Sequence, residues 1–183
     1  MSVSTIYEPP WNWSIRAEIK IGRSQEYMKK ATASHDLRNF FEKNNAPSYN
    51  AEVGIMSYQF TEREWNNQKY DNQEGWLDWM RRQKKEKHVN FKLIGGPKIR
   101  AKTELSELLS ESVIEKIAIL PEHETFHVVY CTNPQLLWVE QYHKNKDAKK
   151  VYSTNKPFEH SWEEMLGLFN ELWEISEKVK EIK

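Results

Sequence analysis

Residues 126–142 read FHVVYCTNPQLLWVEQY, and this stretch decides the fold. Two runs rich in β-branched and aromatic residues flank Thr132, Asn133 and Pro134, residues that are typical of turns. The pattern predicts a β-hairpin. The two strands of a hairpin pair antiparallel and begin a sheet. Each other segment of the chain would either add a strand to this sheet or pack against one of its faces.

Further strands are predicted before the hairpin. Residues 11–21, WNWSIRAEIKI, alternate strictly between apolar and polar side chains, which is typical of a strand with one buried face. Residues 48–60 are predicted to form another strand, with Gly54 as a candidate bulge. Residues 88–102 resemble a hairpin that turns at its paired glycines.

Helices are predicted where apolar residues recur every three or four positions. Residues 34–44 form one such stretch, and a second begins at Thr103, with its leucines facing inward. A longer helix begins with the capping-box pattern at Ser161, and its apolar spacing continues to Ile182. Residues 75–80, GWLDWM, fit a helix or a strand equally well.

Composition bounds the class of protein. The chain has 183 residues, of which 38% are hydrophobic and 30% charged, which suits a globular domain with a proper core. No apolar run could span a bilayer, and the first residues do not resemble a secretory signal. The lone Cys131 excludes an internal disulfide and is compatible with a reducing compartment. We therefore expect residues 1–183 to form one cytoplasmic α+β domain, whose curved, mainly antiparallel sheet is backed by two or three helices.

Charge is unevenly distributed, although the formal net charge is +0. From Arg81 to Lys102, here called the basic block, nine residues are basic and only Glu86 is acidic. From Thr103 to His127, here called the acidic block, six residues are glutamate. Solvated faces of neighbouring elements, or pairing between the two blocks, would explain this pattern. The functional interpretation is phosphate binding by the basic block, in particular by Arg81, Arg82, Lys84 and Lys85.

A short motif in the acidic block points to zinc. Residues 123–127, His-Glu-Thr-Phe-His, match the H-E-x-x-H pattern of zincin metallopeptidases, in which two histidines bind the metal and the glutamate is the base. On a helix, His123 and His127 would share one face, whereas on a strand they would lie about 13 Å apart. A single zinc ion needs both nitrogens within about 2.1 Å. Pro121 and the β-rich run that follows favour a strand.

One tryptophan has surroundings that are unusual for a core residue. Trp65 lies among charged and amide side chains, so it is a candidate platform on which a base could stack. Tyr27 and Trp138 are candidates for the opposing walls of such a cleft. A loop tryptophan that covers the edge of the core is the competing interpretation.

The surrounding stretch, residues 40–76, resembles the eukaryotic mRNA cap-binding translation initiation factors. It reads FFEKNNAPSYNAEVGIMSYQFTEREWNNQKYDNQEGW, in which Trp65 and Trp76 are eleven positions apart and Gly75 precedes the second. The paired tryptophans in residues 11–13 add to the likeness, which extends over roughly residues 11–80. It implies a curved sheet backed by helices and a stacking role for Trp65. Asn66 stands where that family has the glutamate that binds the guanine edge.

Three functions follow as hypotheses. The first is a non-catalytic binding protein that recognises a nucleotide or RNA end through an aromatic cleft and the basic block. The second is a protein-binding inhibitor or immunity-type module. The third is a zinc-dependent hydrolase with His123 and His127 as ligands and Glu124 as the base. Only the third would require an enzyme or a metal, and no other cofactor is indicated because no phosphate-binding glycine loop occurs.

Overall fold

The computed structural model describes residues 29–31, 33–57, 74–96, 103–119, 127–140, 149–154 and 161–179. Within these residues it contains four helices: α2 (Ala33–Lys43), α3 (Trp76–Lys87), α4 (Thr103–Ser110) and α5 (Ser161–Ile175). Its strands are β1 (Lys29–Ala31), β2 (Glu52–Met56), β3 (Asn90–Gly95), β4 (Ile117–Ile119), β5 (His127–Thr132), β6 (Gln135–Glu140), β7 (Lys149–Thr154) and β8 (Glu177–Val179). The strand predicted at residues 11–21 lies outside the described residues.

The described strands form one sheet in the order β1-β7-β6-β5-β2-β3-β4-β8. Five of the neighbouring pairs are antiparallel, while β2 with β3 and β3 with β4 are parallel. The sheet is therefore mainly antiparallel, as predicted, and β2 joins its antiparallel part to its parallel part. The predicted hairpin is confirmed as β5 and β6, in which Thr132 pairs with Gln135 across the turn.

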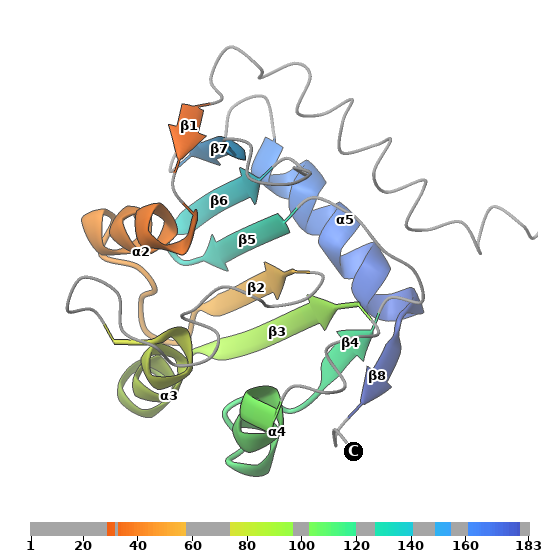
Figure 1. Ribbon diagram of the computed structural model, residues 1–183. Helices are drawn as coiled ribbons and strands as arrows, with labels where there is room; N and C mark the ends of the chain where they lie inside the picture. The colour runs from red at the N-terminus through yellow and green to blue at the C-terminus, as the bar shows by residue number, and fades with distance from the viewer. Residues whose placement is uncertain are drawn as a thin grey trace, which may run out of the picture.

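Helices cover both faces of this sheet (Figure 1). Helices α2, α3 and α4 lie on one face, and α5 lies on the other. The sequence predicted two or three helices packed against the sheet. Three helices cover the first face, and α5 covers the second. The α+β class predicted from the sequence is confirmed.

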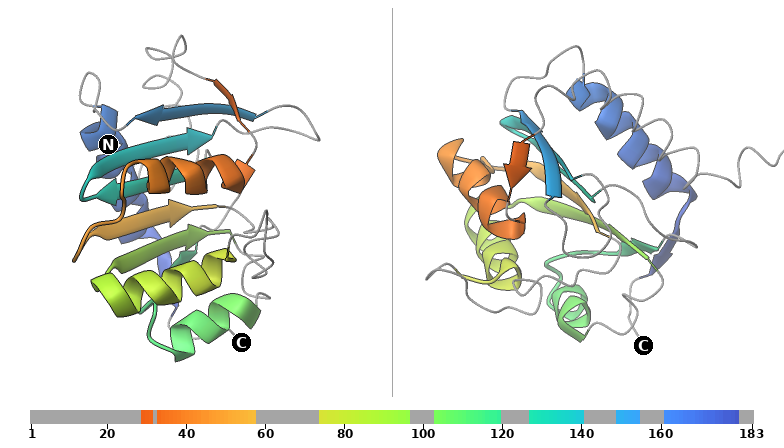
Figure 2. Two further views of the ribbon diagram at one scale, coloured as in Figure 1. Left: turned by 90° about the vertical axis from the view of Figure 1, so that its left-hand side faces the viewer. Right: turned by 45° about the horizontal axis from the view of Figure 1, so that its top comes forward.

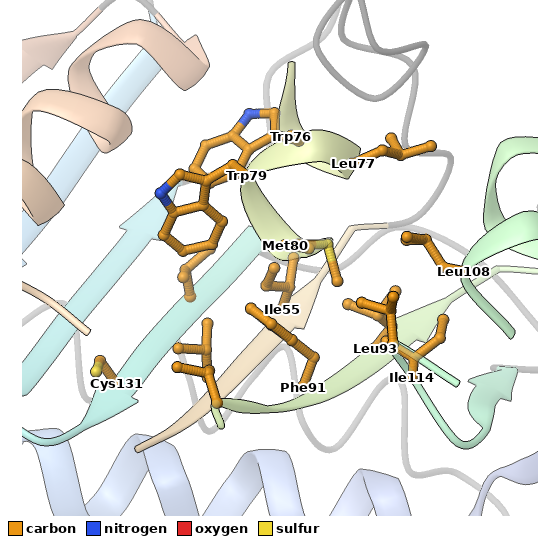
Figure 3. Packing of buried hydrophobic residues seen from close by; sticks show 14 of the residues in the cluster. Ile55, Trp76, Leu77, Trp79, Met80, Phe91, Leu93, Leu108, Ile114 and Cys131 are labelled. Atoms are coloured by element: carbon orange, nitrogen blue, oxygen red, sulfur yellow. The ribbon is translucent and has the colours of Figure 1, made fainter. Parts of the chain in front are cut away.

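The main core lies between the sheet and the three helices of the first face. Alternate residues of the central strands, such as Val53 and Ile55, point into it because successive side chains of a strand face opposite sides. The rings of Trp76 and Trp79 on α3 pack against each other with centroids 5.1 Å apart (Figure 3). The GWLDWM stretch is therefore helical, and both of its tryptophans are buried.

The second face of the sheet carries a smaller core under α5. Tyr130 of β5 contacts Phe169 of α5, with ring centroids 4.9 Å apart. Gly54 pairs in regular register with Lys92 and Tyr130, so the predicted bulge is not present. Its role is steric, because a Cβ atom at Gly54 would lie 2.0 Å from Cε1 of Tyr130. The glycine makes room for the tyrosine ring.

Two predictions of local structure were wrong. The hairpin predicted at Gly95 does not form, because β3 has parallel neighbours on both sides where a returning strand would have to pair. The last helix ends at Ile175 rather than continuing to Ile182. Beyond Ser176, whose hydroxyl donates to the carbonyl of Leu172 in the last turn, the chain becomes β8 and pairs with β4. Tertiary pairing thus overrides the helical spacing.

Candidate nucleic-acid interface

Helix α3 carries the first half of the basic block on its outer side. Its inner side buries Trp76, Leu77, Trp79, Met80 and Gln83, and this fixes which positions face outward. Asp78, Arg81 and Lys85 lie opposite the buried stripe, where three- and four-residue spacings bring them onto one surface. The helix therefore presents its charges on a surface that the core holds rigidly.

Arg81 is bound to carboxylates of the acidic block. Its guanidinium donates to Glu111 at 2.6 Å and 2.9 Å, to Glu107 at 3.2 Å and to Asp78 at 2.9 Å. Hydrogen bonding to Glu111, followed by that to Asp78 and Glu107, raises the pKa of Arg81 further above its ordinary value. These ion pairs link α3 to α4, so the predicted phosphate ligand Arg81 is already occupied by the protein itself.

Arg82, in the middle of α3, is engaged in the same way by Glu74, which lies just before the helix. Its Nε atom donates to Glu74 at 2.8 Å, its Nη2 atom also contacts Glu74, and Glu86 lies 3.8 Å from Nη1. Hydrogen bonding to Glu74 raises the pKa of Arg82. The two arginines of the candidate site therefore face carboxylates that would compete with a phosphate.

The lysines in the last turn of α3 have different surroundings. Lys84, Lys85 and Lys87 all lie in the last turn, and Lys85 is exposed. Within the described part of the chain no carboxylate forms an ion pair with Lys84 or Lys85. The Nζ atom of Lys87 donates to the carbonyl of Pro47 at 2.9 Å. Helix α2 ends on the same side of the molecule, with Lys43 in its last turn (Figure 2, left).

Trp138, one predicted wall of the aromatic cleft, is buried. Trp138 is 4% exposed and packs against Phe40, with ring centroids 5.7 Å apart, so it belongs to the core and is not the wall of an open cleft. The reason lies in its register, since Trp138 pairs with Val129 in the middle of the sheet. Trp65 and Tyr27 lie outside the described residues.

The second histidine of the zinc motif, His127, lies in a strand and not in the helix that the motif requires. His127 is the first residue of β5 and pairs with Glu140 of β6, which agrees with the extended conformation predicted for it. His123 and Glu124 lie outside the described residues. Among the residues that are described, no three His, Cys, Asp or Glu side chains gather as metal ligands would. The structure thus gives the zinc-hydrolase hypothesis no support.

A second polar cluster, not predicted from the sequence, lies on the α5 side of the sheet. The hydroxyl of Tyr130 donates to Oε1 of Glu52 at 2.5 Å, and Nζ of Lys92 lies 3.3 Å from the same oxygen. Burial, reinforced by the bond to Glu52, raises the pKa of Tyr130. Lys92 also lies over the ring of Trp173 at 5.5 Å. The only sequence signal for this cluster was the polar Glu52 and Lys92 in otherwise apolar strands.

Cys131 lies on the opposite side of the same strand from Tyr130. Burial in the core raises the pKa of its thiol to about 11, so it is protonated at neutral pH. A buried, protonated thiol is a poor nucleophile. Cys131 is therefore a packing residue.

The chain matches no known family, and no curated protein matches its sequence. Among solved structures, it is similar to TrmBL2, an archaeal chromatin protein whose structure shows a novel mode of DNA binding. The similarity covers 91% of this chain and 67% of that chain, at 10% sequence identity and a TM-score of 0.47. Among the described helices, none is both long and apolar enough to cross a bilayer. The similarity assigns neither a family nor a ligand to this chain.

Proposed function

We propose that this protein binds nucleic acid without catalysing a reaction, and that the last turn of α3 contacts the phosphates. The observation that supports this proposal is the difference between the middle and the last turn of one helix. Arg81 and Arg82 are held by carboxylates, whereas Lys84 and Lys85 have no carboxylate partner among the described residues. Positive charges without an acidic partner are those that can replace the counterions of a phosphate backbone.

Lysines at this position also have a structural role that the test must separate from binding. Cations near the C-terminal end of a helix stabilise it by about 0.3–1 kcal/mol, because they face the negative end of the helix dipole. Glutamine substitution keeps much of the side-chain length and removes the charge. The double variant Lys84→Gln/Lys85→Gln is therefore suited to the test, with Arg81→Gln/Arg82→Gln as the matched control on the same helix.

We expect a labelled single-stranded RNA to bind with an affinity that falls as salt rises. Each phosphate contact contributes about −0.7 to the slope of log affinity against log salt, so losing two contacts should flatten the slope by about 1.4. Fluorescence anisotropy over a salt series measures it. The lysine variant should flatten the slope, and the arginine variant should leave it nearly unchanged. If neither variant alters the slope, or no RNA binds, the proposal fails and the protein-binding hypothesis takes its place.

The resemblance to cap-binding factors supports a finer hypothesis, in which Trp65 stacks on a guanine base. Four other tryptophans, Trp76, Trp79, Trp138 and Trp173, are at most 6% exposed, so a bound nucleotide cannot stack on them. A guanine nucleotide should therefore quench part of the tryptophan fluorescence, and Trp65→Phe should abolish the quenching. Equal quenching in the variant would disprove this role for Trp65.

A further inference from the structure

One large aromatic side chain, Tyr49, is exposed beside the lysine-rich last turn of α3. Tyr49 is 58% exposed, and Ile175 is the other large hydrophobic residue that is left exposed in the described part of the chain. Tyr49 contacts the ring of His88, with centroids 5.1 Å apart and ring planes at 75°. His88 directly follows the last turn that carries Lys84, Lys85 and Lys87. An exposed aromatic pair and a group of lysines thus meet at one place.

The backbone around Tyr49 is fixed on both sides. The amide of Ser48 donates to the carbonyl of Asn133 at 2.8 Å, in the β5–β6 turn, and the amide of Asn50 donates to the carbonyl of Lys87 at 2.8 Å. The bond from the Lys87 side chain to Pro47 adds a third tie to α3. A ring that is held in place in the free protein loses little conformational freedom on binding, which favours affinity.

His88 occupies a backbone conformation that is unfavourable for it. It caps α3 with φ of 52°, in the left-handed region, where glycine is the usual residue because a side chain is strained there. Glycine at this position would relieve the strain but would remove the imidazole beside Tyr49. His88 therefore serves as the C-cap of α3 and also presents an exposed imidazole beside the ring of Tyr49.

The position of this pair suits a strand of nucleic acid. Helices α2 and α3 both end on the side of the molecule where β2 and β3 begin, because each helix leads into a strand and these two strands are parallel (Figure 2, left). The last turns of both helices, with Lys43 on α2 and Lys84, Lys85 and Lys87 on α3, therefore flank the loop that carries Tyr49. Aromatic platforms beside cationic residues are the usual means of binding single strands.

We propose that Tyr49, flanked by His88, is a stacking platform for an unpaired base, so that the protein prefers single-stranded to double-stranded nucleic acid. This inference rests on the proposed function, because the lysines of the same surface would hold the phosphates on either side of the stacked base. A base inside a duplex has no free face to offer, so the platform would contribute nothing to duplex binding.

The test compares a labelled oligouridylate with an RNA duplex of the same length, bound to four variants. Tyr49→Ala should weaken oligouridylate binding by about five- to 150-fold, the range for removing one stacking side chain, while Tyr49→Trp should retain it. His88→Gly should leave the melting temperature unchanged or higher and still weaken binding. Ile175→Ala, which removes the other exposed hydrophobic residue, should bind like the original protein.

The outcomes separate this inference from the proposed function. If Tyr49→Ala binds oligouridylate normally while Lys84→Gln/Lys85→Gln binds it weakly, the platform is disproved and phosphate binding stands. Equal losses for the oligouridylate and the duplex in Tyr49→Ala would also overturn the platform, since no unpaired base would be involved. If neither RNA binds the original protein, both proposals fail together.

Discussion

The two faces of the central sheet are covered in different ways. Helices α2, α3 and α4 cover one face with apolar side chains, among which Trp79 contacts Phe41, Trp76 and Phe91. Helix α5 covers the other face, where Tyr130 is hydrogen-bonded to a half-buried carboxylate. The same strands supply both faces through alternate residues. The first face, which also buries Arg38 and Gln83, depends chiefly on how well volume is filled, and the second depends also on the hydrogen bond between Tyr130 and Glu52.

The largest loss of stability is expected from truncating a buried aromatic side chain between the sheet and helices α2, α3 and α4. Trp79 is 2% exposed, and Trp79→Ala removes a ring that three other aromatic residues contact. We expect the free energy of unfolding to fall by about 3–5 kcal/mol, the usual cost of truncating a buried large aromatic. Urea denaturation followed by circular dichroism measures this. A loss below about 1 kcal/mol would show that the face can collapse around the gap, and the contrast between the faces would disappear.

A smaller effect is expected from Tyr130→Phe on the α5 face. This variant keeps the ring contact with Phe169 and loses the hydrogen bond to Glu52. Hydrogen bonds to charged groups contribute about 1.5–3 kcal/mol, and the 29% exposure of the Glu52 side chain places the expected loss at the lower end of that range. Urea denaturation at neutral pH measures the loss.

The same variant should change how stability depends on pH. The pKa of Tyr130 is higher in the folded protein than the ordinary value of about 10 in an unfolded chain. The stabilisation is therefore fully present below about pH 10 and is lost as the pH rises above it. The difference in stability between the original protein and Tyr130→Phe should shrink in strongly alkaline solution. A constant difference across this range would mean that the hydroxyl does not ionise on unfolding.

Much of the fold could be predicted because its signals are local. Two β-rich runs around an Asn-Pro turn specify the β5–β6 hairpin, and three- and four-residue apolar spacing specifies α2, α4 and the start of α5. The parallel pairing of β2 with β3 could not be predicted, because a strand sequence does not encode which neighbour it will have. Strand β8 was missed for the same reason, since its residues continue a helical spacing and only β4 gives them a partner.

Less of the candidate site could be predicted. The basic block was identified, but its division into paired arginines and terminal lysines depends on where Glu74, Glu107 and Glu111 lie in space. Trp138 was placed in a cleft because its sequence neighbours do not reveal the strands beside it. Tyr49 was missed because residues 48–60 were predicted to form a strand, whereas β2 begins only at Glu52 and leaves Tyr49 in the loop before it.

The position of β2 also has a consequence for the order in which the chain folds. On one side of β2 lies the parallel strand β3, and the paired residues Glu52 and Asn90 are 38 residues apart in the chain. On the other side lies β5, and Glu52 and Tyr130 at this junction are 78 residues apart in the chain. During synthesis β5 emerges well after β2, so one edge of β2 stays unpaired until then. An unpaired edge rich in apolar residues is prone to aggregation. The pairing of β2 with β5 is thus the step that joins the hairpin of β5 and β6 to the parallel strands.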